Sequence, residues 1–237
     1  MVLASERAGI ADSGWRNILR KVPIGCVLYS PALPEGFEAG VIKDYSGQGN
    51  NGTITGATWE RLPSGLWVLS YDGSDDITTI TKDASLQIAT TFAVEVWMKW
   101  RVVYGTGDAS RPVTSSAVAA TDINYFFYQE NDTLVFYTTA KTSGSVVIVA
   151  DTWYHWVGVY VPSTSITLYK NGVVASTNTT TIPAAATTTD TDVILGTSWS
   201  ASDLFNGWMA LLRIYNPPPS AAVIAEHYNK ERHLFEV

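Results

Sequence analysis

From about residue 25 onward, the sequence consists of short runs of β-branched and aromatic residues that are separated by turn-forming clusters. Runs of this kind are typical of strands, and the Gly, Asn, Asp, Ser and Pro residues between them favour turns. The pattern therefore predicts an all-β fold, a sandwich or jelly roll of antiparallel strands. The clearest runs lie at residues 66–71, 92–100, 125–129, 134–138, 153–161 and 166–169.

One hairpin is specified by two residues. Asn171 and Gly172 separate the strand-like runs 165–170 and 173–175. An Asn-Gly pair supplies the positive φ angles that a two-residue hairpin turn requires. We therefore expect a β-hairpin with its turn at these two positions.

The C-terminal part of the chain predicts a single helix. Three consecutive prolines at 217–219 end the last strand, and Ser220 can cap a helix that follows. Residues 221–231 have good helix propensity and apolar residues at helical spacing. We expect this helix to pack against the sandwich.

The first 24 residues form an N-terminal arm that precedes a single domain at 25–237. Residues 1–22 hold four basic and two acidic residues and so carry a charge of +2, whereas the remaining chain carries −9. The arm contains an apolar stripe and a candidate N-cap, Ser13, which predict a short amphipathic helix. The helix either docks on its own domain or engages another copy or a larger assembly through residues 1–22. The stripe comprises Trp15, Ile18, Leu19 and Val22.

Composition excludes several classes of protein. The 15 basic and 22 acidic residues give a net charge of −7, which repels polyphosphate and opposes general nucleic-acid binding. Cys26 is the only cysteine, so the chain forms no intramolecular disulfide and no site built from several thiolates. The first 25 residues lack an unbroken apolar segment, and no run is long enough to span a membrane, so we expect neither a signal peptide nor membrane insertion.

Several motifs carry a family resemblance. They are Asp-Tyr-Ser-Gly-Gln-Gly-Asn-Asn-Gly at 44–52, Phe-Ala-Val-Glu-Val-Trp at 92–97, Leu-Tyr-Lys-Asn-Gly at 168–172 and Leu-Arg-Ile-Tyr-Asn at 212–216. In this order and spacing they resemble the laminin G-like, concanavalin A-like jelly-roll domains, over about residues 25–230. The resemblance implies two curved antiparallel sheets and, in most members, glycan or protein binding without catalysis.

The resemblance also bears on metal binding. Many members hold a structural calcium with the Asp-x-Ser-Gly loop, here at Asp44, and with an aspartate of the closing strand. Ala210 stands at that closing-strand position, so one anionic ligand is missing. Calcium prefers six to eight oxygen ligands, and we therefore expect no cofactor beyond a weak structural calcium at Asp44.

The sequence offers no pair of catalytic carboxylates. A glycosidase needs two carboxylates that face one cleft, but Glu95 stands alone in its strand-like run. We interpret Glu95 as a polar residue of the sandwich that is satisfied by its neighbours, and His155 as a residue that packs or hydrogen-bonds within the sheet. The chain is therefore predicted not to be an enzyme.

Two long loops supply candidate ligand-binding residues. Trp199 lies in a polar loop without a strand pattern, and it could stack on a sugar ring whose hydroxyls Asp203 accepts. The alternative is that Trp199 packs as a lid over the end of the sandwich. Tyr104 and Asp108 form a weaker pair in the other loop.

These observations leave three functions open. The first is a noncatalytic recognition module for a glycan or glycoprotein surface, which the loop aromatics favour. The second is a structural or decoration protein of a virion or cell surface layer, with the basic arm as its tether. The third is a sandwich-fold glycosidase. The resemblance implies an extracellular or virion-associated protein, although a cytoplasmic one stays open.

Overall fold

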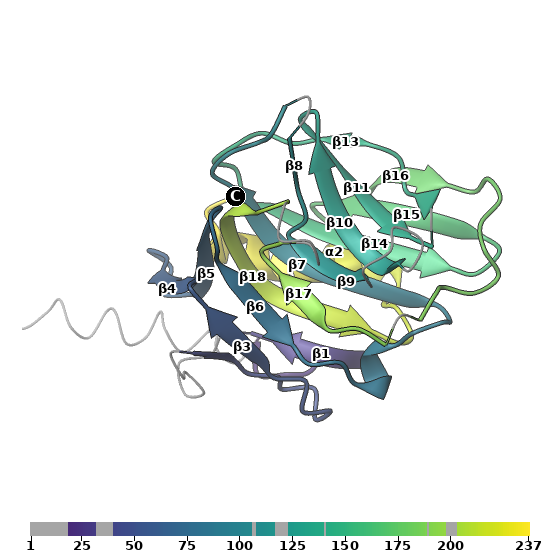
Figure 1. Ribbon diagram of the computed structural model, residues 1–237, viewed down its shortest axis with the longest axis horizontal. Helices are drawn as coiled ribbons and strands as arrows, with labels where there is room; N and C mark the ends of the chain where they lie inside the picture. Colours follow the sequence, from purple (N-terminus) through teal and green to yellow (C-terminus); the bar gives the residue numbers. More distant parts are fainter. Residues whose placement is uncertain are drawn as a thin grey trace, which may run out of the picture.

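The computed structural model describes residues 19–31, 40–105, 108–116, 123–139, 141–188, 190–197 and 203–237. These residues form two antiparallel sheets, A and B, which lie face to face (Figure 1). The predicted all-β sandwich is confirmed, and its layout is consistent with a jelly roll. The path through sheet A runs β16 (Val173–Asn178), β15 (Ser165–Lys170), β14 (Tyr154–Val161), β7 (Phe92–Trp100), β18 (Asn206–Tyr215), β5 (Trp67–Asp72) and β4 (Thr58–Arg61), and β1 (Cys26–Ser30) pairs with β18.

Sheet B is built mostly of shorter strands. Its path runs β12 (Lys141–Thr142), β11 (Thr133–Thr138), β10 (Ile123–Glu130), β9 (Val113–Ser116), β17 (Val193–Leu195), β6 (Ile77–Ile80), β3 (Gly52–Thr55) and β2 (Val41–Ile42). Two further strands pair with this path, β13 (Val146–Val147) with β11 and β8 (Ala109–Ser110) with β10. Because β8 lies within residues 104–112, that segment is not the uninterrupted loop predicted from the sequence.

The main core lies between the two sheets, and a second buried layer lies on the outer face of sheet A. Strand β7 shows both layers, because alternate side chains of a strand point to opposite faces. Phe92, Val94 and Val96 belong to the core between the sheets. On the other face, Trp97 is buried in a separate cluster beneath the C-terminal residues Leu234 and Phe235.

The predicted hairpin is confirmed. Asn171 and Gly172 connect β15 to β16 with φ angles of 54° and 80°. A Cβ atom added to Gly172 would lie 3.0 Å from the Cβ of Tyr228 and 3.2 Å from the Cα of Ala225. The tip of the hairpin is therefore pressed against the C-terminal helix.

The predicted C-terminal helix is confirmed as α2 (Ala221–Glu231). The Ser220 side chain accepts a hydrogen bond from the Val223 amide and caps the helix as expected. Ile224 of α2 is buried against the outer face of sheet A. Two short 3₁₀ helices complete the described elements, η2 (Ala84–Leu86) and η3 (Arg232–Leu234).

The described end of the N-terminal arm lies on its own domain. Leu19 is buried in the cluster that contains Trp97 and Phe235, and its carbonyl oxygen accepts a hydrogen bond of 2.6 Å from Tyr29 Oη. Trp15 and Ile18 lie outside the described residues. Docking on the same domain is therefore observed for the last part of the arm, and assembly through residues 1–22 stays a prediction.

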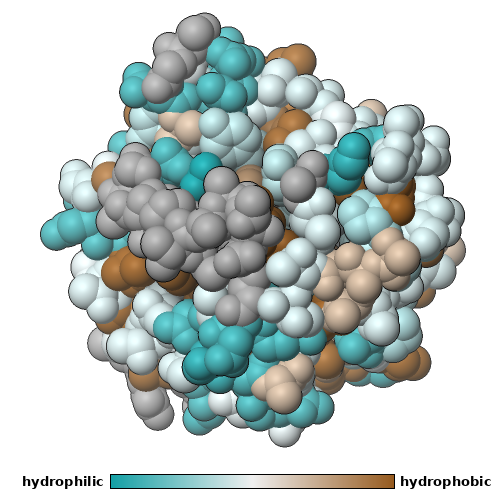
Figure 2. All heavy atoms as spheres, turned by 45° about the vertical axis from the view of Figure 1, so that its right-hand side comes forward, coloured by the Kyte–Doolittle hydropathy of each residue, from teal (hydrophilic) through white to brown (hydrophobic). Residues whose placement is uncertain are grey.

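The surface is mainly polar on the side shown in Figure 2. Apolar residues of the described chain appear there as separate small groups among polar ones. No helix in the described ranges has the length and apolar character needed to cross a membrane.

Candidate functional site

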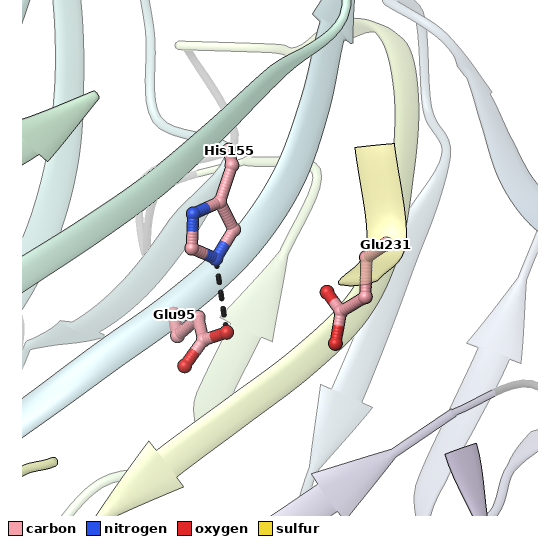
Figure 3. Close-up of side chains that lie close together, drawn as sticks. All are labelled: Glu95, His155 and Glu231. Atoms are coloured by element: carbon pink, nitrogen blue, oxygen red, sulfur yellow. Dashed lines mark hydrogen bonds and ion pairs between the residues drawn. The ribbon is translucent and has the colours of Figure 1, made fainter. Parts of the chain in front are cut away.

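A charged cluster lies between sheet A and α2, and we call it the helix-covered cluster. Strands β7, β14 and β18 each contribute one side chain to it, and α2 contributes two more. The close-up in Figure 3 shows Glu95 and His155 on their two strands and Glu231 reaching toward them from the end of α2. The members are Glu95, His155, Arg213, His227 and Glu231.

The carboxylate of Glu95 is saturated with hydrogen bonds. Its Oε1 accepts from Arg213 Nη1 at 2.5 Å and from His155 Nε2 at 2.9 Å. His227 Nδ1 lies 3.1 Å from the same oxygen, and Tyr215 Oη donates to Oε2 at 2.8 Å. As predicted, Glu95 is satisfied by its neighbours and His155 hydrogen-bonds within the sheet, while His155 Nδ1 is buried without a hydrogen-bond partner.

Arg213 joins the two carboxylates of the cluster. Its Nη2 donates to Glu231 Oε1 at 2.5 Å, and Glu231 Oε2 also accepts from Trp97 Nε1 at 2.8 Å. Burial by itself raises the pKa of Glu95, but the Arg213 guanidinium and the histidine hydrogen bonds outweigh it and hold that pKa well below the ordinary value. Glu95 is thus an anionic partner of Arg213.

The helix-covered cluster is poorly suited to metal binding or catalysis. Glu95, His155 and Glu231 could place ligand atoms close together, but the Arg213 guanidinium already bridges the two carboxylates. A cation at this point would have to displace a buried positive charge. Glu95 is also fully buried, so it presents no accessible surface to a substrate.

Asp44 organises its own loop. Oδ1 accepts hydrogen bonds from the Tyr29 and Ser46 amides, and Oδ2 accepts from Ser46 Oγ and the Asn50 amide, at 2.8–2.9 Å. Protein donors therefore already surround both oxygens. Ala210 packs in the apolar cluster around Trp97, so its side chain supplies no oxygen to this loop.

A second charged cluster lies on the outer face of sheet B, and we call it the Arg111 surface. Strand β10 alternates between the two faces: Tyr125 and Phe127 point into the core, whereas Phe126 and Tyr128 point outward. Arg111 follows the short strand β8 and covers these outward rings. The surface comprises Arg111, Phe126, Tyr128, Tyr137 and Asp203.

The Arg111 guanidinium is held by rings and by a carboxylate. It lies 5.1 Å from the ring centre of Phe126 and 5.3 Å from that of Tyr128, and Nη1 lies 3.0 Å from Asp203 Oδ2. The side chains of Arg111 and Asp203 are each 22% exposed. The Phe126 and Tyr137 rings are stacked, with 4.6 Å between centres and 7° between planes. A charged pair and a flat aromatic group thus lie side by side at the surface.

Two polar atoms of this surface lack partners. Arg111 Nε and Thr114 Oγ1 are buried and have no hydrogen-bond partner. Thr114 is the ladder partner of Phe126 on β9, so both atoms flank the same ring. Arg213 Nε and His155 Nδ1 of the helix-covered cluster are also buried without partners, so unpaired atoms do not distinguish the two regions.

The two candidate loops from the sequence meet at this surface. The Arg111 amide donates to the Asp203 carbonyl oxygen at 3.0 Å, which joins the loop of Asp108 to the loop of Asp203. Tyr104 lies at the base of the first loop, where burial and the Asp108 carboxylate raise its pKa. Trp199 lies outside the described residues.

Apart from Asp203, the side chains of the Arg111 surface were not predicted from the sequence. Arg111, Phe126, Tyr128 and Tyr137 were assigned no role. The signal was available in the consecutive aromatic residues 125–128, because a strand with one face exposed to water would carry polar residues at alternate positions.

A family model for the concanavalin A-like lectin/glucanase superfamily matches residues 72–225. The chain belongs to this superfamily. The predicted resemblance is thereby confirmed. No curated protein matches the chain in sequence.

Solved structures agree with the superfamily fold. The binding domain of Paraclostridial Mosquitocidal Protein 1 has a TM-score of 0.67 and 14% identity, over 89% of this chain and 52% of that one. The ligand binding domain of botulinum neurotoxin serotype D, in complex with N-acetylneuraminic acid, gives 0.66 and 12%, over 86% and 50%. This chain therefore spans about half the length of these toxin domains.

A smaller neighbour matches over nearly its whole length. Domain 4 of AbnA, a GH43 extracellular arabinanase from Geobacillus stearothermophilus, in complex with arabinotriose, has a TM-score of 0.63 and 18% identity. The match covers 85% of this chain and 98% of that domain. At such identities, the likeness to these structures shows the fold alone.

Proposed function

We propose that the chain is a noncatalytic recognition module that binds a glycan or the glycan of a glycoprotein through the Arg111 surface. The observation that carries this proposal is the Arg111–Asp203 ion pair, held beside outward-facing rings at the surface. The pair lies where the two loops with predicted binding residues meet.

The chemistry of this surface suits a sugar. The C–H face of a sugar ring packs on aromatic rings, and Tyr128 and Tyr137 are both partly exposed. Sugar hydroxyls both donate and accept, so they complement an arginine and a carboxylate that lie next to each other. Loops on a rigid sandwich commonly carry binding residues.

Three comparisons support this proposal without deciding it. The superfamily contains lectins as well as glucanases. One structural neighbour is a toxin domain in complex with N-acetylneuraminic acid, and another is an arabinanase domain in complex with arabinotriose. The arabinanase domain, which this chain matches over 98% of that domain, is thus a domain of this fold in complex with a sugar.

The absence of catalysis is proposed from the helix-covered cluster. Glu95 and Glu231 are buried, and both bond to the Arg213 guanidinium. Hydrolysis requires one carboxyl group that can donate a proton beside another that acts as a base or nucleophile, with access for a substrate. Incubation with a β-glucan panel should release no reducing sugar; release that Glu95→Gln abolishes would contradict this part of the proposal.

The role in a virion or cell surface layer stays a prediction. It depends on residues 1–22, most of which lie outside the described part of the chain. Light scattering of the full chain and of a chain without residues 1–22 tests it, because an assembly that uses the arm should lose mass on truncation.

The binding proposal is tested on a glycan array with a matched pair of variants. We expect wild type to bind at least one glycan and Arg111→Ala to lose that binding. The control is Arg101→Ala, because the Arg101 guanidinium lies 3.9 Å from the ring centre of Trp208 on the outer face of sheet A. Loss of binding in Arg101→Ala alone would place the site on the other sheet, and no binding by wild type would overturn the proposal.

A further inference from the structure

We infer that the Arg111 surface selects neutral glycans over sialylated or sulfated ones. This inference rests on the proposed function and adds the class of ligand. The comparisons leave the charge of a ligand open, because one structural neighbour is in complex with an acidic sugar and another with a neutral sugar.

Negative charge surrounds the surface. In the described parts of residues 104–111 and 203–205 and in strands β10 and β11 with their turn, Arg111 is the only cation. Its partner Asp203 already balances it. The same segments hold three further carboxylates, so the site has a net charge of −3. The three are Asp108, Glu130 and Asp132.

These carboxylates lie close to the binding groups. Glu130 is two residues from Tyr128 on β10, and it is the ladder partner of Ala109, next to Asp108. The Asp132 amide donates to the Tyr104 carbonyl oxygen, so the turn after β10 lies beside the same loop. The next cation along sheet B is Lys141 on β12. Its ladder partner is Thr138, whose buried side chain points into the sandwich and away from the Arg111 surface.

The Arg111 guanidinium already has an anionic partner, Asp203. An incoming carboxylate or sulfate would have to share the guanidinium with Asp203, whose Oδ2 lies 3.0 Å from Nη1. That arrangement places two anions side by side, and like charges at close range repel each other. Among the other donors of Arg111, Nε is buried beside Phe126 and has no acceptor.

A neutral sugar avoids this conflict. One hydroxyl can donate to the Asp203 carboxylate while a neighbouring hydroxyl accepts from Arg111, so the ion pair stays intact. The apolar face of the sugar ring lies on Tyr128 and Tyr137. It brings no charge near the three surrounding carboxylates, Asp108, Glu130 and Asp132, which we call the rim. The ion pair then acts as a hydrogen-bonding fork for adjacent hydroxyl groups.

The test uses pairs of oligosaccharides that differ only in a terminal sialic acid or a sulfate, together with arabinotriose as an uncharged probe. We expect the neutral member of each pair to bind about tenfold more tightly at low ionic strength, and the difference to shrink as salt screens the rim. Titration calorimetry on the full chain measures both effects.

Two charge variants decide whether the rim causes the preference. Glu130→Gln with Asp132→Asn should keep binding of the neutral member and narrow the gap to the acidic one; Asn tolerates the positive φ of 57° at position 132. The control removes two carboxylates on the α2 side of the molecule, Glu226→Gln with Glu236→Gln, and should leave the gap unchanged. Thermal melting of both variants verifies that they fold.

The outcomes separate the two proposals. Tighter binding of the acidic member, or a gap that neither salt nor the rim variant changes, overturns the neutral preference while glycan recognition stands. If no oligosaccharide of either class binds, both the recognition function and the preference are wrong.

Discussion

The helix-covered cluster and the Arg111 surface are built from the same kinds of side chain but differ in access to water. Each contains an arginine, at least one carboxyl group and aromatic rings. Arg213 is 2% exposed and bonds to two carboxylates, whereas Arg111 is 22% exposed and bonds to one. The comparison teaches that burial, and not residue type, separates a structural cluster from a surface that can take a ligand.

The largest expected effect comes from breaking the helix-covered cluster. Glu95→Gln keeps the shape of the side chain but removes the charge of one of the two carboxyl groups that bond to buried Arg213. Loss of one member of a buried ion pair costs about 3–5 kcal/mol of unfolding free energy. Urea unfolding measures it, with Glu226→Gln on the exposed side of α2 as the control that should leave the midpoint unchanged. Equal midpoints for the two variants would show that the cluster contributes nothing.

The same cluster predicts how stability depends on pH. The folded-state pKa of Glu95 lies well below its ordinary value of 4.5, so its contribution is fully present above that value and is lost as pH falls through the folded-state pKa. Unfolding free energies between about pH 3 and pH 7 should decline on the acid side for wild type and decline less for Glu95→Gln. Parallel curves of unfolding free energy against pH for the two proteins would contradict the lowered pKa of Glu95.

The contact between the hairpin and α2 should give a smaller effect. Gly172→Val places a β-branched residue at a φ of 80° and against Tyr228, which should cost about 1 kcal/mol or more. Gly172→Asn should cost less, because Asn tolerates a positive φ. The thermal midpoints of the two variants check this order, and an unchanged midpoint for Gly172→Val would contradict the turn geometry.

The Arg111 surface should contribute little to stability. Asp203→Asn breaks a partly exposed ion pair, and such pairs are typically worth less than about 1 kcal/mol. We expect a nearly unchanged urea midpoint together with a loss of glycan affinity. A loss of stability as large as that of Glu95→Gln would make this pair structural as well and would remove the contrast between the two regions.

Calcium should have the smallest effect. Protein hydrogen bonds already occupy both Asp44 oxygens, and Ala210 supplies no ligand. A tight site would add about 2.7 kcal/mol at a hundredfold excess over its dissociation constant. We expect thermal midpoints with excess calcium and with chelator to agree closely. A much lower midpoint with chelator would show that the protein has a calcium site after all.

Much of the fold was predictable from local sequence. Long runs such as 92–100 became strands because their apolar side chains dictate burial, and Asn171-Gly172 set the hairpin. The short strands β3, β6 and β9 were missed, because their threonine and serine residues, of which Thr78 and Ser115 are buried, are typical of loops in sequence. Their pairing depends on neighbours that are distant in the sequence, which local patterns do not encode.

The candidate site was predictable only in part. Asp203, Tyr104 and Asp108 were expected from loop composition, and their loops meet as a result of the β8–β10 and β9–β10 pairing. Arg111 could not be assigned, since its role depends on which loop faces it across the sheet. The helix-covered cluster likewise unites Glu95 with residues of α2 that lie more than 130 positions away.

The contrast between the two arginines is tested most directly by nuclear magnetic resonance of the isotope-labelled protein during titration with a neutral oligosaccharide that it binds. We predict that the Nε–H signal of Arg111 and the amide signals of Tyr128 and Tyr137 shift with ligand, while the Nε–H signal of Arg213 stays in place. Shifts centred on Arg213, His227 and Glu231, with none at Arg111, would contradict the account.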